Sequence, residues 1–498
     1  MKLQAALRRR PLAIGVAAFF VMILGCWIMT NPPGSAPDEE AHHVKAVAAG
    51  GGDLVGAPDP QPFTAEQRKQ LVVQSTRVFR VPGRLVDANY GCNRFMPQRP
   101  ADCLRDGGRP GDLDRSTYVG TYPPFLYVPA GLAARAARDP FTAVYFARFV
   151  FGAIAAALLV RAALVLAGDD RSHGFALVGL VMATTPMALF LAGSLNISGL
   201  QITATLSFAA ALIAASRVPD GLCAGWGWTA FAGAVAVLSR PEGIGWVVLC
   251  VILFVLLKRE PDRGWYRRRE ALAIGAVLGA ATVSIGGWQV VYGSSFGFGP
   301  SGLGVAARDV FGQSRLLVDQ SVGVFGWLDT RLPTVVYLAW LAVIAGLVVG
   351  ALIVGSWRSR ASMVLLALGV MAAAIAIQGF VLGPARLSGQ LIQARYVMPC
   401  ALLLPLVAGE ILTRRYRGSY ALIPRVAVPL FSVAHVFALY TYARRNAVGR
   451  AGSRLLTGAT WSPPGGWLPW AALAVVSLIA VGACALLDRR PLSPTALA

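Results

Sequence analysis

The chain has 498 residues, of which 56% are hydrophobic and only 14% are charged, and its mean hydropathy is +0.59. A soluble protein carries about a quarter charged residues and could not bury this much apolar surface, so a soluble globular enzyme is excluded. Long apolar runs exclude a disordered chain, and the 54 glycines show no three-residue period of a fibre. The composition predicts a membrane protein with several spans.

The net charge of +21 comes from 45 Lys and Arg against 24 Asp and Glu. Such a balance is typical of nucleic-acid-binding proteins when the cations gather on one surface. Here the basic residues fall instead in short segments between apolar runs, as in Lys258–Arg269 and Arg414–Arg417. Cationic short loops mark the cytoplasmic side of a membrane protein. The charge therefore indicates topology, and we expect no nucleic-acid partner.

Twelve apolar segments follow one another along the chain. They cover residues 12–29, 140–167, 174–192, 199–216, 225–238, 243–257, 271–291, 334–355, 361–382, 396–412, 420–441 and 467–486. A helix needs about 20 residues to cross a bilayer, and 225–238 and 243–257 fall short of this. These two flank Ser239–Gly243, and tilted, re-entrant or half-length helices are the alternatives there. The predicted fold is an all-α polytopic bundle of about 12 transmembrane helices.

The first span is expected to be an uncleaved anchor. Its apolar run is longer than the roughly 7–15 residues of a signal-peptide core, and no small-residue cleavage pattern follows it closely. Starting inside, twelve crossings put both termini and the basic Lys258–Glu270 segment in the cytoplasm. We therefore expect a multi-pass protein of the cell membrane, embedded in the lipid bilayer.

This topology divides the chain into four regions. They are an N-terminal cytoplasmic tail with the first transmembrane helix (1–30), a large extracytoplasmic loop with an acidic motif and interfacial helices (31–139), a transmembrane bundle with short loops (140–486) and a cytoplasmic tail (487–498). Cys92 and Cys103 lie in the large loop, where a disulfide bond would stabilise the fold by roughly 3 kcal/mol. Two free thiols are the alternative. No Cys/His spacing predicts a metal site.

The large loop opens on the sequence Pro37-Asp38-Glu39-Glu40-Ala41-His42-His43. Three adjacent carboxylates at a membrane interface repel one another and lose hydration, which raises carboxyl pKa values and favours a proton-accepting role. On a helix, Asp38 and His42 share a face, so a histidine could orient the base. The alternative is structural, with Asp38 capping a helix and the glutamates answering its positive end.

This proline-led Asp-Glu-x-x-His motif, followed by Tyr122-Pro123-Pro124, resembles the DUF2142 family of bacterial membrane proteins. Further pieces agree in the same order along the chain: Ser194–Leu200, Ser239–Gly243, Gly323–Asp329 with Leu332-Pro333, and Gln393–Pro399. The resemblance runs from about residue 15 to beyond residue 440. Two departures are mild: Ala394 stands where glycine is expected, and Ile197 where proline is more usual.

That family in turn resembles the GT-C type of membrane glycosyltransferase. Such enzymes take a sugar from a polyprenyl-phosphate or pyrophosphate carrier and pass it to an acceptor on the outer face. Their hallmark is an acidic pair in the first outer loop, which Asp38 and Glu39 match, so the resemblance implies that these two residues are catalytic. No nucleotide is released in this reaction, and we expect neither a cofactor nor a metal.

A leaving phosphate needs a cation, and the planar arginine fork matches two phosphate oxygens. Arg395 begins the tenth span, and Arg240 lies in the break between two short segments. Arg148 lies within the second span, where an unpaired charge costs at least about 2–3 kcal/mol. Snorkelling of Arg148 to the head groups is the alternative. Trp327 either offers a stacking face to a sugar or anchors a loop at the interface.

The expected function is therefore that of a membrane glycosyltransferase which moves a sugar from a polyprenyl-phosphate-linked donor to a glycan or lipid acceptor of the cell envelope. A transporter or flippase of a lipid-linked or envelope precursor is one alternative, since broken helices also fit alternating access. A non-catalytic protein of envelope assembly is another. The candidate substrate-binding residues are His42, Tyr122, Arg148, Asn196, Arg240, Trp327, Asp329, Arg395 and Tyr396.

Overall fold

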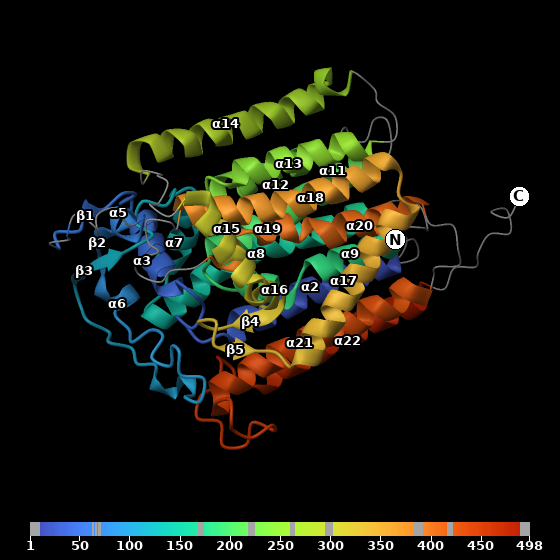
Figure 1. Ribbon diagram of the computed structural model, residues 1–498. Helices are drawn as coiled ribbons and strands as arrows, with labels where there is room; N and C mark the ends of the chain where they lie inside the picture. The colour runs from blue at the N-terminus through green and yellow to red at the C-terminus, as the bar shows by residue number, and fades with distance from the viewer. Residues whose placement is uncertain are drawn as a thin grey trace, which may run out of the picture.

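A bundle of apolar helices carries a lobe of short helices and strands at one end, as the computed structural model shows (Figure 1). The structure describes residues 10–61, 64, 67, 71–167, 174–217, 225–258, 264–293, 302–381, 392–415 and 422–488. The helices of the bundle are α2 (Pro11–Thr30), α8 (Pro140–Ala167), α9 (Gly174–Ala183), α10 (Pro186–Ala192), α11 (Ile197–Ala215), α12 (Trp226–Ser239), α13 (Gly243–Leu257), α14 (Arg269–Tyr292), α17 (Thr334–Val354), α18 (Trp357–Ala376), α19 (Met398–Ala401), α20 (Leu403–Arg415), α21 (Leu422–Val448) and α22 (Leu468–Leu487).

The predicted spans fall on these helices. Among the described residues, eight helices are long and apolar enough to cross a membrane, and the pair α9 and α10, bent by 64°, would make nine. The apolar helices α12 and α13 are shorter, as the sequence predicted, and residues 240–242 form the break between them. The fold is thus an all-α, multi-pass membrane bundle, and the count of twelve crossings stays a prediction.

Helices α2 and α22 pack antiparallel, which places the start of α2 and the end of α22 at the same end of the bundle. Gly15 packs against Cys484, and the Cys26 thiol, further along α2, donates to the Trp470 carbonyl near the start of α22. An even number of crossings, as predicted, gives this arrangement. We call the opposite end, which carries residues 31–139, the loop end (Figure 1).

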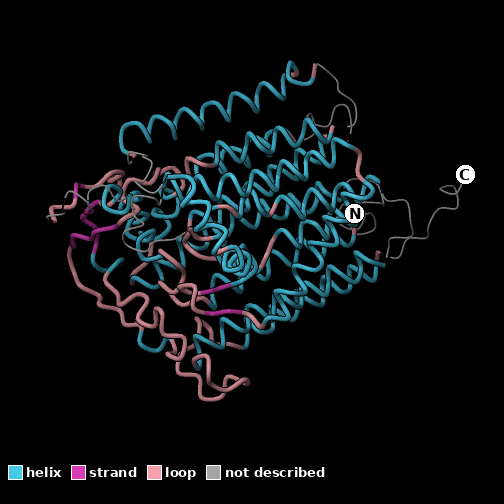
Figure 2. The backbone as a smooth tube through the Cα atoms, viewed as in Figure 1, coloured by secondary structure: helices cyan, strands magenta, loops and turns pink. Residues whose placement is uncertain are grey.

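The lobe at the loop end holds most of the short elements (Figure 2). They are α3 (Glu39–Gly50), β1 (Ala57–Pro58), α5 (Leu71–Ser75), β2 (Arg77–Pro82), α6 (Gly83–Val86), a 3-10 turn (Ala101–Cys103), β3 (Asp112–Thr117) and α7 (Tyr127–Arg135). The three strands form an antiparallel sheet in the order β1-β2-β3, with Arg77 opposite Thr117. The later segments α15 (Gly302–Gly312), α16 (Ser314–Gly323), β4 (Val324–Phe325) and β5 (Thr330–Arg331) complete this end.

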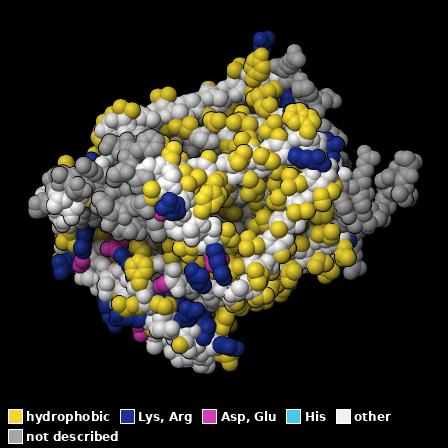
Figure 3. Space-filling view, viewed as in Figure 1, with side chains coloured by type: hydrophobic (Ala, Val, Ile, Leu, Met, Phe, Trp, Pro, Cys, Tyr) yellow, Lys and Arg dark blue, Asp and Glu magenta, His cyan; other side chains and the backbone are white. Residues whose placement is uncertain are grey.

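Charge is distributed along the bundle as expected for a membrane protein. Hydrophobic side chains cover its visible face, and the acidic side chains on that face gather at the loop end (Figure 3). At the opposite end, the buried Glu410 carboxylate pairs with Arg414 at 2.6 Å and also with Arg217 at 2.6 Å. Two cations on one buried carboxylate satisfy its hydrogen-bonding capacity where water is scarce.

Candidate functional site

The site is built on the acidic turn, residues 31–40, which links α2 to α3. Asp38 adopts a left-handed backbone conformation (φ 62°, ψ 5°) immediately before α3 begins at Glu39, and its side chain makes no capping hydrogen bond. A left-handed residue costs roughly 1–2 kcal/mol, less for aspartate than for most side chains. This turn sends the carboxylates of Asp38, Glu39 and Glu40 in three directions, and each finds a different arginine.

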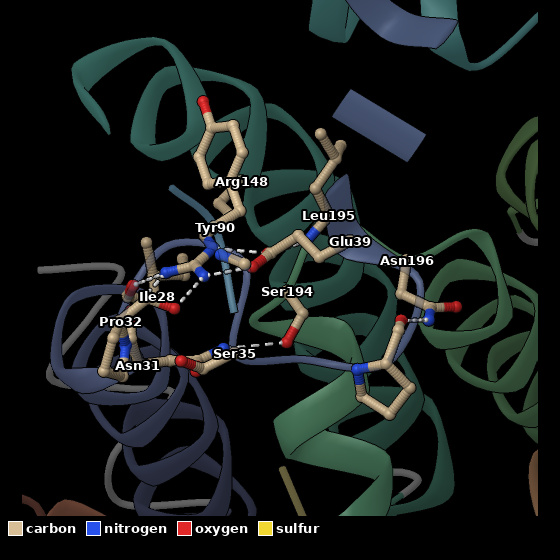
Figure 4. Close-up of polar contacts among 12 residues, drawn as sticks. Ile28, Asn31, Pro32, Ser35, Glu39, Tyr90, Arg148, Ser194, Leu195 and Asn196 are labelled. Carbon is tan, nitrogen blue, oxygen red and sulfur yellow. Dashed lines mark hydrogen bonds and ion pairs between the residues drawn. The ribbon is translucent and has the colours of Figure 1, made fainter. Parts of the chain in front are cut away.

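Glu39 forms a fully buried pair with Arg148 of α8 (Figure 4). Arg148 donates from Nε to Glu39 Oε1 at 2.6 Å and from Nη2 to Oε2 at 2.5 Å, and both side chains have no exposed surface. The backbone N–H groups of Gly34 and Leu195 each donate to one carboxylate oxygen at 2.9 Å. Because both oxygens are fully engaged, Glu39 has no lone pair oriented toward a substrate.

The remaining donors of Arg148 hold the backbone of the acidic turn. Nη1 donates to the carbonyl oxygens of Ile28 at 3.0 Å and Asn31 at 2.5 Å, and Nη2 donates to that of Pro32 at 3.0 Å (Figure 4). All five N–H groups of the guanidinium are therefore used within the protein. Arg148 neither snorkels nor faces a ligand. It positions the turn.

Asp38 lies at the edge of the turn, and its side chain is 21% exposed. The Tyr118 hydroxyl donates to Oδ1 at 2.7 Å, and the buried Arg395 guanidinium donates to Oδ2. Burial alone would raise the pKa of the Asp38 carboxyl, but the charge of Arg395, together with His42 and the Tyr118 hydrogen bond, outweighs burial and holds it below its ordinary value. The sequence predicted the opposite direction, because it could not show that each carboxylate has its own arginine.

Arg240 faces Arg395 across the ring of Tyr396. The two guanidinium carbons lie 4.9 Å and 5.2 Å from the centre of that ring. Arg240 also donates to the Tyr122 hydroxyl at 3.2 Å and pairs with Glu242 at 3.1 Å. Arg240 lies at the break between α12 and α13, where the helix ends with an extended residue, so its side chain leaves the helix and reaches this group. Two guanidiniums flanking one aromatic ring form a cationic site at the loop end.

Arg395 keeps an unused donor beside Asp38. Its Nε is buried and has no hydrogen-bond partner among the described residues. A buried, unpaired donor of a charged group costs free energy that an anionic ligand oxygen would recover. The chemistry of this place is therefore a carboxylate that can accept a proton beside cations that can bind an oxyanion.

His42 lies one helical turn after Asp38 and is close to Asp38 and the two arginines. Its Nδ1 is 2.6 Å from the Tyr127 hydroxyl, and the two rings stack at 5.8 Å. Burial lowers the pKa of His42 to about 3; the Asp38 carboxylate opposes this shift, and the Arg395 and Arg240 charges add to it. The imidazole is thus neutral at physiological pH. Nδ1 and the Tyr127 hydroxyl share one hydrogen bond, and the tautomer of the neutral ring decides which of them donates.

A profile of the family described as "Predicted membrane protein (DUF2142)" matches residues 19–404. The chain belongs to the DUF2142 family. Among solved structures, it is similar to ArnT from Cupriavidus metallidurans in the apo state, with a TM-score of 0.46 and 14% identity over 94% of this chain and 76% of that chain. For the same ArnT bound to undecaprenyl phosphate, the TM-score is 0.44 and the identity 16%, with the same coverage. No curated protein matches significantly.

Some of the other candidate residues lie at the site with Asp38, and the rest support the acidic turn or a neighbouring loop. Tyr122, Arg240, Arg395 and Tyr396 lie together with Asp38 and His42 at the site. Asn196 caps α11, where its Oδ1 accepts from Ser198, and donates to the Pro37 carbonyl at 2.9 Å. It therefore supports the acidic turn from beneath.

Asp329 and Trp327 lie on the other side of the acidic turn. Asp329 is paired with the buried Arg445 of α21 at 2.8 Å, so it stabilises its own loop. Trp327 donates from Nε1 to the Gly34 carbonyl at 3.3 Å and stacks under the guanidinium of Arg94 at 3.7 Å. Neither residue contacts the Asp38 group directly in any hydrogen bond of the described chain.

The sequence missed four residues that shape this end of the DUF2142 fold, namely Tyr118, Tyr127, Arg94 and Arg445. Tyr127 is fully buried against His42. Its pairing has no local pattern, since 85 residues separate the partners. A disulfide bond joins Cys92 to Cys103 in the large loop. No group of three or more His, Cys, Asp or Glu within the described ranges could hold a metal ion.

Proposed function

We propose that this DUF2142 protein is a membrane glycosyltransferase which moves a sugar from a polyprenyl-phosphate-linked donor to an acceptor at the outer face of the cell membrane. The observation that carries the proposal is the juxtaposition of the Asp38 carboxylate with two arginines, one of which keeps an unpaired buried donor. A lipid-borne phosphate would bring its sugar to the loop end, at the membrane interface, where this group lies.

Asp38, rather than Glu39, is the general base in this proposal. Its carboxylate is partly exposed and ionised, whereas Glu39 is saturated by four donors. The acceptor hydroxyl oxygen attacks the anomeric carbon and its proton passes to Asp38. The bond from that carbon to the phosphate oxygen breaks, and its electron pair leaves with the lipid phosphate.

Arg395 and Arg240 would bind the leaving phosphate, because guanidinium forks match its oxygens and oppose the charge it gains. The bound phosphate would then share the charge of Arg395 with Asp38. The pKa of the carboxyl would then rise toward its ordinary value, which makes the base stronger when the donor is present. His42 would stay neutral and would not compete for the acceptor proton, because burial lowers its pKa to about 3.

The test measures release of polyprenyl phosphate from synthetic polyprenyl-phosphate sugars by the protein in proteoliposomes. Release is the common product of transfer and of hydrolysis, so the acceptor need not be known. We expect Asp38→Asn to reduce the rate by roughly 10²–10⁴-fold, the usual contribution of a general base. Asparagine also tolerates the left-handed backbone at this position.

Asp112→Asn is the matched control, because Asp112 is half-exposed in β3 and forms only a surface pair with Arg80. This control should keep the wild-type rate. Wild-type release by Asp38→Asn would refute the proposal. Movement of the lipid-linked sugar across the bilayer without release would instead establish the transporter alternative.

A further inference from the structure

We propose that a second site, beside the acidic turn, binds carbohydrate on an aromatic platform. We define the aromatic platform as the side chains of Phe95, Trp327, Arg94 and Glu40. The rings of Phe95 and Trp327 meet edge to face at 5.8 Å, and the Arg94 guanidinium covers Trp327 at 3.7 Å. Arg94 also pairs with Glu40 at 3.1 Å.

The platform is open where a ligand would lie. The side chain of Phe95 is 66% exposed, although an aromatic ring of this size would gain free energy by burial. Glu40 is 48% exposed and Arg94, the residue before Phe95, is 33% exposed, so a carboxylate and a guanidinium are both accessible on this platform. An exposed ring that is rimmed by an acceptor and a donor has the polarity of a sugar-binding surface, because a sugar presents an apolar C–H face and a rim of hydroxyls.

The backbone is strained at this place. Four described non-glycine residues have positive φ. One of them, Asp38, lies in the acidic turn, and two, Phe95 and Leu328, lie in the two loops that form the platform. Each left-handed residue of this kind costs free energy that the surrounding structure must offset, and such strain concentrates at functional sites. Phe95 is part of the aromatic platform, and Leu328 directly follows Trp327 of the platform.

Two devices hold the platform in place. The Cys92–Cys103 disulfide closes the loop that carries Phe95. The buried Arg445 guanidinium then joins that loop to the Trp327 loop, because it donates to the Asn93 carbonyl at 2.8 Å and to Asp329 at 2.8 Å. A platform built in advance loses little conformational entropy when a ligand binds.

A glycine completes the stack. Gly91 has φ +61°, and a Cβ there would lie 3.0 Å from Arg94 Nη2 and 3.1 Å from its Nε. The missing side chain lets the guanidinium fold back over Trp327. The close approach of Gly91 to Arg94 is not needed to close the loop, because the Cys92–Cys103 disulfide already does so.

A membrane anchor is the competing explanation for exposed Phe95 and its neighbour Met96, which is 51% exposed. The half-exposed Arg94–Glu40 pair argues against it, because entering the hydrocarbon would desolvate both charges. We therefore assign carbohydrate. Because Trp327 donates to Gly34 in the acidic turn, the platform borders the segment that carries Asp38. Its use as the acceptor subsite rests on the proposed function.

The experiment titrates the protein in nanodiscs with soluble glycans by calorimetry. The probes are cellohexaose, chitohexaose, maltohexaose and oligogalacturonate, which cover neutral, acetamido and acidic sugars. We expect at least one to bind and Phe95→Ala to weaken that binding by about tenfold, in the range of one aromatic contact. Phe95→Tyr should restore it. Phe311→Ala should leave binding unchanged, since Phe311 is another exposed ring, 57% exposed, on α15.

The outcomes separate the two proposals. Polyprenyl phosphate release to water needs no glycan, so release by the wild-type protein without binding of any glycan overturns the platform and spares the transferase. Glycan binding without any release overturns the transferase and spares the platform. Binding of no probe, or quenching of the fluorescence added by Phe95→Trp in nanodiscs of brominated lipid, would overturn the carbohydrate assignment.

Discussion

Glu39→Gln should unfold the protein rather than disable its chemistry. The carboxylate accepts two hydrogen bonds from Arg148 and one each from the Gly34 and Leu195 backbones, with no exposed surface. An amide leaves the buried guanidinium uncompensated and turns an N–H group toward a backbone N–H. Breaking a buried ion pair from one side costs about 3–5 kcal/mol. The folded-to-unfolded ratio should therefore fall roughly 10²- to 10⁴-fold.

The measurement is reversible unfolding in mixed detergent micelles. Glu40→Gln is the matched control, since the same change one residue away removes only a half-exposed pair and should cost less than about 1 kcal/mol. Asp38→Asn should likewise fold. A Glu39→Gln protein of wild-type stability that released no polyprenyl phosphate would refute this reasoning, because Glu39 would then act in the chemistry.

The pair cannot be replaced by apolar side chains. A buried ion pair often tolerates such replacement, since its desolvation penalty disappears with it. Here Arg148 and Glu39 also satisfy five backbone groups of the protein, three carbonyls and two N–H groups. Each orphaned group costs about 1–3 kcal/mol. We expect the double variant Glu39→Leu/Arg148→Met to be no more stable than Glu39→Gln.

Three further predictions concern the loop end. Burial lowers the pKa of His43 from 6.5 to about 4. As the pH is lowered from 6.5 to 4, the unfolded chain therefore binds a proton before the folded one does, and the free energy of unfolding should fall by about 1.4 kcal/mol per pH unit. His43→Gln should flatten this slope in pH-dependent unfolding. Replacing Cys92 and Cys103 by alanine should cost roughly 3 kcal/mol in the same assay, with no loss if the bond does not form in the cell. Gly91→Ala should cost about 1–2 kcal/mol and weaken glycan binding, whereas Gly111→Ala, at a positive φ with open space, should cost as much and leave binding intact.

The sequence predicted the bundle well because membrane spans are local patterns. The predicted segments 140–167 and 243–257 coincide with α8 and α13, because each helix begins and ends where its apolar run does. The break at Ser239–Gly243 was also correct, because Pro241 has no backbone N–H with which to continue α12. Helix α21 extends to Val448, beyond the predicted end, since its last turns carry Arg445 into a buried pair.

The site was predicted less well because its contacts are distant in sequence. The acidic motif and Arg395 were both singled out, but 357 residues separate Asp38 from Arg395, and no spacing rule joins them. Adjacent positions suggested that Asp38 and Glu39 would share an environment. The left-handed turn at Asp38 separates them instead, into one saturated carboxylate and one accessible carboxylate.

The contacts of Glu39 also constrain how the protein is made. Its partners Arg148 and Leu195 are synthesised 109 and 156 residues later. At about 5–20 residues per second, the ribosome needs roughly 8–30 s to supply them both. During that interval the first helix has reached the membrane, yet the segment after it has no fixed shape. The acidic turn can therefore reach its final structure only after the chain has been made as far as Leu195.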